Sequence, residues 1–231
     1  MADLKEGRGN EDGLGKNGLI IICAALILLV VVYAGNRLGE ERAKLSAKKA
    51  SLGTASFKKR DYSQAVTYLR EAVRLDPNNA AAAKALGRSH EALEQPDAAA
   101  KAYSDSVAAD PKQPEVLTRL ALIHWDQGKR AEAMKDIKQA LAVDNNAVAP
   151  QILLIQIYKQ TGEFDKAIGV FDRLIKAGPP GVDMAGLYVE KGVVYVQKKD
   201  FAAARKAWKK ALEIDPKNLK ALNLLDVFKS R

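Results

Sequence analysis

Five alanines recur at nearly fixed spacing and mark a repeating hydrophobic pattern along the chain. Ala65, Ala99, Ala133 and Ala167 are each 34 residues apart, and Ala204 follows after a further 37 residues. A bulky side chain stands four residues after each alanine, and other apolar residues recur at three- and four-residue spacing. This spacing predicts pairs of amphipathic helices, each with one apolar face. A period of 34 residues is typical of an array of small, similar helical units.

A turn sequence closes each unit. The five turns read LDPNN, ADPKQ, VDNNA, AGPPG and IDPKN. Proline cannot continue a helix, and it pushes the residue before it out of the helical region, so the second helix of a unit is expected to end there. Two irregularities interrupt the pattern: Asn145 replaces the proline of the third turn, and three extra residues, Val182 to Met184, precede the last unit.

These matched positions resemble the tetratricopeptide repeat family, whose units place small, large, small and proline residues in this order. The resemblance covers residues 46–218 and implies a right-handed α-solenoid of helix–turn–helix units. Such a stack needs a terminal cap, and residues 219–231 are expected to supply a capping helix. The repeats are predicted at 46–79, 80–113, 114–147, 148–181 and 185–218.

A second hydrophobic pattern is the uncharged run LIIICAALILLVVVYA at residues 19–34. With one glycine on each side it has 18 residues, about 27 Å as a helix, which just spans the hydrocarbon core of a bilayer. The predicted segments are a polar tail at 1–17, a transmembrane helix at 18–35 and a basic juxtamembrane linker or helix at 36–45. A cleaved signal peptide is the open alternative, because Val32-Tyr33-Ala34 resembles a cleavage site, although the tail is long and acidic for such a peptide. The expected fold class is therefore all-α, with an N-terminal transmembrane helix before the solenoid.

The net charge of +9 is concentrated next to this apolar run. Residues 35–60 have a net charge of +6, whereas residues 61–231, a much longer segment, have only +4. Bases near a bilayer are attracted to anionic headgroups, and the predicted membrane-surface residues are Arg37, Arg42, Lys44, Lys48 and Lys49. A nucleic-acid partner is not expected, because it requires bases along one face of the fold. The predicted location is an inner or plasma membrane that the chain crosses once. The number of basic residues is nearly equal on the two sides of the apolar run, so the pattern does not decide whether the repeats face the cytoplasm or the exterior.

The residues that carry chemistry in enzymes are scarce. Cys23 is the single cysteine and lies within the apolar run, and His90 and His124 are the two histidines. Both histidines occupy a repeat position where the family favours tyrosine, so we expect them to fill the contact between helices. A zinc site needs more thiolates or imidazoles than the chain contains. We therefore predict no enzyme, no metal and no cofactor.

The resemblance also implies where a partner would bind. In this family the first helix of each unit lines a concave groove, with repeat positions 2, 5, 9 and 12 pointing into it. The predicted groove residues are Lys84, Arg88, Leu122, Trp125, Ile152, Gln156, Lys159, Val189 and Val193. Such a groove suits an extended peptide or an amphipathic helix, and Trp125 is the expected anchor contact. Contact with a neighbouring or capping helix is the open alternative for Leu122, Val189 and Val193.

The sequence supports two function classes. The first is a single-pass membrane-anchored adaptor that binds protein or peptide partners, for the assembly or biogenesis of a membrane or envelope complex. The second is a scaffold that self-associates through its repeats and lines a membrane as a homo-oligomer. The two differ in the size of the assemblies that the repeat region forms by itself.

Overall fold

The computed structural model consists of helices joined by short turns in the part of the chain that it describes. The backbone is described for residues 12–229, and side chains are described for residue 21 and residues 26–229. The bounds of the helices are α1 Asp12–Lys58, α2 Tyr62–Leu75, α3 Ala80–Ala92, α4 Pro96–Ala109, α5 Pro114–Asp126, α6 Arg130–Val143, α7 Val148–Gln160, α8 Phe164–Ala177, α9 Met184–Gln197, α10 Phe201–Ile214 and α11 Leu219–Val227. The predicted all-α solenoid is thus confirmed for these residues.

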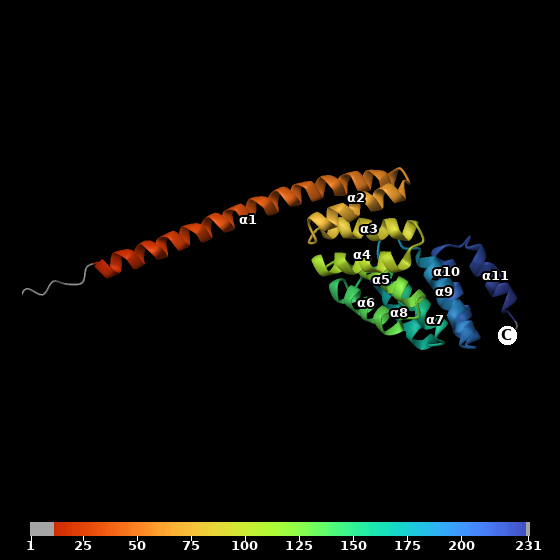
Figure 1. The fold of residues 1–231 in the computed structure, drawn as a ribbon. Coiled ribbons are helices and arrows are strands. Elements are labelled where there is room, and N and C mark those ends of the chain that lie inside the picture. The colour runs from red at the N-terminus through yellow and green to blue at the C-terminus, as the bar shows by residue number, and fades with distance from the viewer. Residues whose placement is uncertain (1–11, 230–231) are drawn as a thin grey trace, which may run out of the picture.

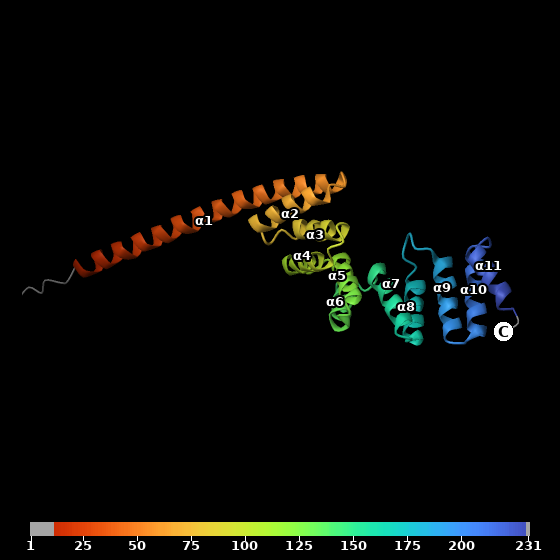
Figure 2. The ribbon, with the colours of Figure 1, turned by 45° about the vertical axis from the view of Figure 1, so that its right-hand side comes forward.

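Helix α1 is far longer than the others. It has 47 residues, and its C-terminal part lies along α2 while its N-terminal part projects away from the stack (Figures 1 and 2). Ser46 ties the two helices together, because its hydroxyl donates to the carbonyl oxygen of Ala72 at 2.9 Å and accepts from Asn79 Nδ2 at 2.9 Å. The first helix of the first predicted repeat is therefore the end of a much longer helix.

The apolar N-terminal part of α1 is only partly described. Among the described residues, no helix combines the length and the apolar character that crossing a membrane requires. The predicted transmembrane helix at 18–35 includes residues 18–20 and 22–25, whose side chains, like that of Cys23, lie outside the description. The transmembrane helix therefore stays a prediction.

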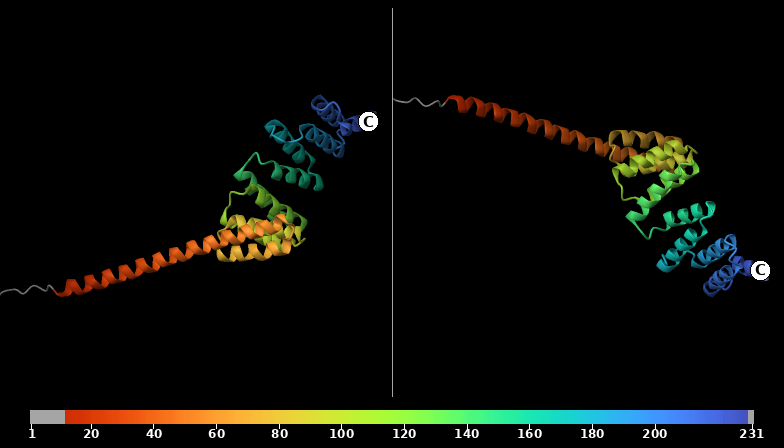
Figure 3. Two further views of the ribbon diagram at one scale, coloured as in Figure 1. Left: turned by 90° about the horizontal axis from the view of Figure 1, so that it is seen from above. Right: turned by 90° about the horizontal axis from the view of Figure 1, so that it is seen from below.

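The five phased alanines lie where the two helices of each pair cross. All five alanines are fully buried. They lie one on each of the second helices, α2, α4, α6, α8 and α10. The pairs follow one another along a curved path from α1 to α11 (Figure 3). Because protein interiors are close-packed, a larger side chain at these positions would have to displace the facing helix. The alanine period thus gave the correct phase of the helix pairs.

Glycine on a first helix lets an aromatic ring on the second helix approach closely. A Cβ atom at Gly87 would lie 2.5 Å from the ring of Tyr103, and a Cβ atom at Gly192 would lie 2.2 Å from Trp208 Nε1. Both rings are fully buried. Residues 87 and 192 are therefore glycine because of this close approach, since both lie inside regular helices.

Aspartate ends the second helices as effectively as proline. Asp76, Asp110, Asp144 and Asp215 are extended at the C-caps, and each carboxylate accepts the backbone N–H two residues further on at 2.9–3.1 Å. In the third turn Asn145 replaces the proline, yet α6 still ends at the residue before Asp144. A carboxylate bonded to the following backbone is a stable turn without proline.

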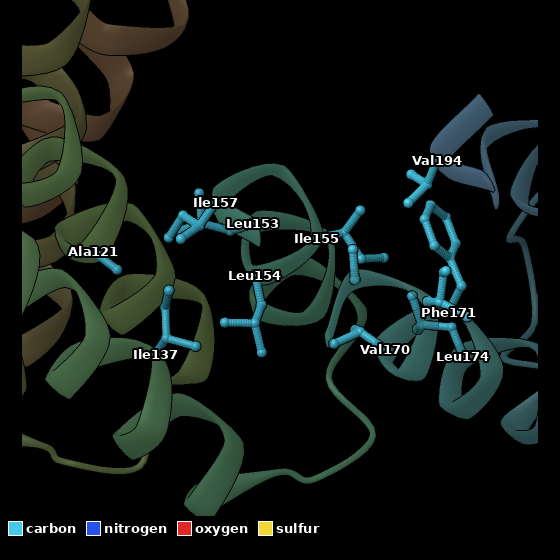
Figure 4. Packing of buried hydrophobic residues seen from close by; sticks show 12 residues of the cluster. Ala121, Ile137, Leu153, Leu154, Ile155, Ile157, Val170, Phe171, Leu174 and Val194 are labelled. Carbon is cyan, nitrogen blue, oxygen red and sulfur yellow. The ribbon is translucent and has the colours of Figure 1, made fainter. Parts of the chain in front are cut away.

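A continuous hydrophobic cluster joins the third, fourth and fifth helix pairs. Twelve buried residues form it, from Ala121 on α5 and Ile137 on α6 to Phe171 on α8 and Val194 on α9 (Figure 4). Helix α7 supplies the centre with Leu153 and its neighbours. Because apolar burial is the main favourable contribution to folding, this cluster fixes α5, α7 and α9 relative to one another.

Candidate partner-binding groove

The first helices of the third and fourth pairs, α5 and α7, form the sides of an open cavity. Its volume is about 370 Å³, and we call it the α5–α7 groove. Leu122 on α5 and Ile152 on α7 line it and are 42% and 39% exposed. Thr118, Arg119, Leu153 and Gln156 also line it. An apolar side chain of a partner would gain free energy by leaving water between Leu122 and Ile152, and the polar residues around them would orient it.

A second cavity of about 560 Å³ shares Ile152 with the α5–α7 groove and extends to the last pair. Val182 and Asp183 of the α8–α9 turn line it, together with Leu187 of α9 and Lys220 of α11. The extra residues before the last unit thus form a wall of this cavity. The two cavities together span three helix pairs, and we call them the candidate partner surface.

A half-buried carboxylate marks the end of the groove nearest α3. Glu91 Oε2 accepts hydrogen bonds from the hydroxyl of Tyr103 and from Arg119 Nη1, the latter at 3.0 Å. Burial and the bond to Glu91 raise the pKa of Tyr103 far above its ordinary value. Burial opposes the charge of Arg119, but Glu91, Tyr103 and Glu115 outweigh it and raise the pKa of this guanidinium. Arg119 is therefore held in place as a permanent cation beside the apolar pair.

An ion-pair bridge closes the opposite side of the candidate partner surface. Glu190 of α9 accepts from Lys159 of α7 at 3.3 Å and from Lys220 of α11 at 2.6 Å. Burial by itself would raise the pKa of Glu190, but Lys220 and Lys159 outweigh burial and lower it. Glu190 thus joins three helices, and Lys159, a predicted groove residue, is engaged with the chain's own carboxylate.

Trp125 lies at the end of α5, outside the lining of the α5–α7 groove. Its Nε1 donates to Gln160 Oε1 at 2.8 Å, and the guanidinium of Arg130 lies 5.4 Å from its ring centroid. The ring is half-buried and packs against the hydrophobic cluster of Figure 4. Trp125 therefore connects α5 to the end of α7, and its role as a partner anchor stays a prediction.

The two predicted valines of α9 differ in accessibility. Val189 is 2% exposed, and it packs with Trp208 of α10 and Ala221 of α11. Its carbonyl oxygen also accepts from Trp208 Nε1 at 3.2 Å. Val189 thus belongs to the contact between the last pair and α11, and it also lines the second cavity; its role as a groove residue stays a prediction. Val193, one turn further on, is half-buried.

The predicted basic residues of α3 lie outside both cavities. The guanidinium of Arg88 lies 5.2 Å from the ring centroid of Phe57 at the end of α1, and Lys84 is half-buried on the same helix. Arg119 lines the α5–α7 groove instead. It stands at repeat position 6, as Glu190 does, a position that the family's groove pattern omits. Position 6 is four residues after position 2 and three before position 9, so it shares a helix face with these two groove positions, and this spacing is the signal that could have indicated both residues.

The basic residues predicted at the membrane surface all lie on α1, beside the apolar segment. Arg37, Arg42, Lys44 and Lys48 are exposed. Lys49 is not free, because its Nζ lies 2.8 Å from Glu71 Oε2 and 5.7 Å from the ring centroid of Tyr68. Lys49 thus holds α1 against α2, and only the other four are available to a surface.

The two histidines make contacts between helix ends, as expected from their repeat position. Nδ1 of His124 lies 2.7 Å from Asp136 Oδ2 on α6, and burial raises the pKa of Asp136 despite this contact. Nδ1 of His90 lies 2.7 Å from Gln95 Oε1 in the α3–α4 turn. The ring of His124 thus links the two helices of its pair, and the ring of His90 links α3 to the turn after it.

Comparison with known proteins relates the chain to one family. Matches to models described as tetratricopeptide repeat cover residues 51–114, 124–189 and 185–218. Among curated proteins, the chain is 28% identical over 108 residues to protein O-mannosyl-transferase TMTC3 of Homo sapiens, which covers 47% of this chain and 12% of that protein. It is 27% identical over 110 residues to small glutamine-rich tetratricopeptide repeat-containing protein 2 of Saccharomyces cerevisiae, covering 46% of this chain and 32% of that protein. The chain thus spans only a minor part of these relatives.

Solved structures share the arrangement of helices. The crystal structure of MamA has a TM-score of 0.68 at 24% identity and covers 77% of this chain and 95% of that one. The crystal structure of YrrB, described as a protein with an unusual peptide-binding site, has a TM-score of 0.61 at 18% identity, covering 76% and 89%. At these identities the likeness establishes the fold of the stack.

Proposed function

Because the chain belongs to the tetratricopeptide repeat family, we propose that it is a membrane-anchored adaptor that holds a protein segment in the α5–α7 groove. The chain is a protein-interaction scaffold of this family, and the proposal adds the site and the anchor. The observation that carries it is the pair Leu122 and Ile152, two half-exposed apolar side chains across an open cavity. Apolar side chains that are exposed in a concave site are typical of binding surfaces, whereas single apolar residues on a convex surface are common and carry no such meaning.

The partner is an amphipathic segment. Leu122 and Ile152 accept its apolar side chains. Arg119 also lines the groove, but Glu91 and Glu115 already pair with it, so the polar walls orient the segment rather than select its charge. YrrB shares this fold and is described with a peptide-binding site, which supports a peptide as the ligand class. Assembly or biogenesis of a membrane or envelope complex is the role that this layout suggests.

A pair of groove substitutions tests the adaptor. Leu122→Ala with Ile152→Ala should weaken partner capture by about 2 kcal/mol or more if the two residues form an interaction hot spot. Capture from detergent-solubilised membranes is quantified for the full-length chain, the double variant and a Leu219→Ala control, which removes an exposed leucine of α11 outside the groove. Partners that are lost with the groove variant and kept with the control support the proposal. Equal recovery with all three proteins would refute it.

Trp125 needs a separate measurement because it serves the fold as well. Truncation to alanine removes the bond to Gln160 and the packing of the ring on the cluster. The melting temperature and partner capture are therefore measured together. Capture lost at an unchanged melting temperature would assign Trp125 to the partner surface, whereas parallel losses would assign it to the core.

The anchor rests on the N-terminal part of α1. Ile21 and residues 26–33 carry large apolar side chains that are more than half exposed, on a helix that projects from the stack (Figure 1). Water is an unfavourable environment for such a run, and a bilayer would bury it. The full-length chain should remain in the membrane fraction through carbonate washing. A mature N-terminus at Gly35 would refute the anchor and support the signal peptide.

Self-association is the second candidate, and α11 favours it. Leu219 and Val227 are 72% and 68% exposed on the last helix of the stack. Sedimentation of the detergent-solubilised chain distinguishes the candidates, because an adaptor remains small on concentration whereas a self-associating scaffold forms growing assemblies. Substitution of both residues by serine should abolish those assemblies if α11 forms the contact.

A further inference from the structure

A cavity on the other side of the stack carries an excess of positive charge. It lies between the second helices α2 and α4, above α3, has a volume of about 420 Å³, and we call it the α2–α4 cavity. Arg70 and Arg74 line it from α2, and Lys101 lines it from α4. Asp105 is the single carboxylate among the lining residues. With a neutral histidine, these side chains give the cavity a net charge of +2.

The three cations of this cavity have no acidic partner within ion-pair distance in the described part of the chain. The ion pairs found there instead join residues such as Lys49 with Glu71 or Arg119 with Glu91. Arg70 and Arg74 are four residues apart, so they project from the same face of α2. Lys101 faces them from the opposite wall. Three unpaired cations that converge on one cavity attract an anionic group from outside the chain.

A buried histidine side chain forms part of the same cavity. His90 is 5% exposed and lines the α2–α4 cavity from below. Its Nδ1 is used by Gln95 Oε1, and no partner of Nε2 is found among the described residues. The imidazole ring thus adds a polar surface to the base of a cavity whose walls carry the cations.

The floor of the cavity indicates what accompanies the anion. Val73, Leu86, Ala98 and Ala102 supply apolar surface between the charged walls. A single small anion would leave this surface in contact with water, whereas an apolar side chain would cover it. A carboxylate next to an aliphatic side chain therefore matches the lining better than a phosphate does.

We propose that the α2–α4 cavity is a second partner site, which takes a carboxylate and a neighbouring aliphatic side chain from an acidic protein segment. The site is distinct from the α5–α7 groove, because the first helices line the groove whereas α2 and α4 are second helices. One chain could then hold two partner segments at once. The carboxylate binds between Arg70, Arg74 and Lys101, and the aliphatic group covers the floor.

A short acidic peptide tests this site directly. The probe is a fluorescein-labelled 12-residue peptide of alternating glutamate pairs and leucine pairs, and the comparison probe has glutamine in place of each glutamate. Fluorescence anisotropy with the detergent-solubilised full-length chain at about 0.15 M salt should show binding at least about tenfold tighter for the acidic probe. Equal affinity for the two probes would overturn the proposal.

Matched variants locate the binding. Arg70→Gln with Arg74→Gln should weaken binding of the acidic probe by about tenfold or more, since it removes two charged donors. Lys135→Gln with Lys138→Gln on α6 is the control, because these exposed bases line a cavity without a histidine. All four residues are exposed, so folding should be unaffected. Equal losses with the two double variants would show diffuse charge attraction and overturn the site.

Two further measurements test the chemistry of the cavity. Ala98→Phe fills the floor without a change of charge, and it should prevent binding of the acidic probe. It is introduced into a chain that already carries Leu122→Ala with Ile152→Ala, so that the α5–α7 groove does not bind the leucines of the probe. Inorganic phosphate at constant ionic strength should not displace the probe. Displacement by phosphate at millimolar concentration, or arginine-dependent binding to phosphatidylglycerol vesicles, would assign the site to a phosphate group and overturn the peptide.

Discussion

Replacement of Gly192 by alanine should destabilise the last helix pair, although alanine is the better helix former. The new Cβ atom would lie 2.2 Å from Nε1 and 2.6 Å from Cδ1 of Trp208. Trp208 is fully buried, and its Nε1 donates to the carbonyl oxygen of Val189 at 3.2 Å. The ring cannot retreat without repacking α10, because a closely packed interior leaves no free space.

The change in the free energy of unfolding combines two unfavourable contributions and one favourable one. Forcing a methyl group into a filled contact costs about 1–3 kcal/mol, and losing the Trp208 hydrogen bond costs about 1–3 kcal/mol more if the donor stays buried without a partner. Better helix propensity returns about 1 kcal/mol. The net expectation is about 3 kcal/mol, within a range of about 1–5 kcal/mol, which for a chain of this length corresponds to a fall of about 6–12 °C in melting temperature.

Gly169 is the matched control. It also lies inside a helix, on α8, but a Cβ atom there would meet nothing within 4 Å. Gly169→Ala should therefore raise stability by about 0.5–1 kcal/mol. Thermal and urea unfolding of the full-length variants is followed by circular dichroism, with tryptophan fluorescence reporting on the Trp208 environment. A Gly192→Ala variant as stable as the wild type, or a Gly169→Ala variant that loses as much, would refute the argument.

Three further predictions use the same unfolding assay. Ala133→Leu should lower the free energy of unfolding by about 1–3 kcal/mol, because it overpacks a buried helix crossing. Ala131→Leu, exposed on the same helix, should change it by less than about 0.5 kcal/mol. Equal effects would show that the alanine phase is wrong. Glu91→Ala should lower the free energy of unfolding by about 1–3 kcal/mol, because it leaves the Tyr103 hydroxyl without its acceptor. Adding Tyr103→Phe to this variant should then lower stability little further. Losses that add strictly would contradict the pairing. The pKa of Glu190 is lowered below its ordinary 4.5, so its ion pairs contribute stability above that pH and lose it as pH falls through the lowered pKa. The difference in urea midpoint between wild type and Glu190→Gln should therefore shrink as pH falls from 4.5 through the lowered pKa, and a difference that grows there would contradict the sign.

The fold was predictable from the sequence because its signals are local. An alanine every 34 residues and apolar residues three or four apart place each helix and its buried face without knowledge of the partner helix. The turn signals were also local, although proline received too much weight: Asp144 ends α6 without it. The sequence did not predict that α1 continues as one helix through Gly35 into the first repeat. Glycine lowers helix propensity, which suggested a boundary there, but it does not forbid a helix.

The site was predictable only in part, because it depends on how helix pairs sit against one another. Repeat position correctly brought Leu122 and Ile152 to one cavity. The same reasoning placed Val189 in the groove, whereas in the structure it is buried with Trp208 and Ala221 at the edge of the second cavity. Arg119 was missed because its position follows from a bond to Glu91, 28 residues away on α3.

By itself, the sequence determined the helix pairs, their phase and their buried faces, since each follows from contacts between residues a few positions apart. It also determined the composition of the apolar N-terminal run. Only the tertiary structure decided which exposed residues meet across a junction, which charges are already paired, and that Arg70, Arg74 and Lys101 converge on a buried histidine. The reason is physical: a periodic pattern fixes directions around each helix axis, whereas distances between side chains of different pairs depend on how the pairs pack together.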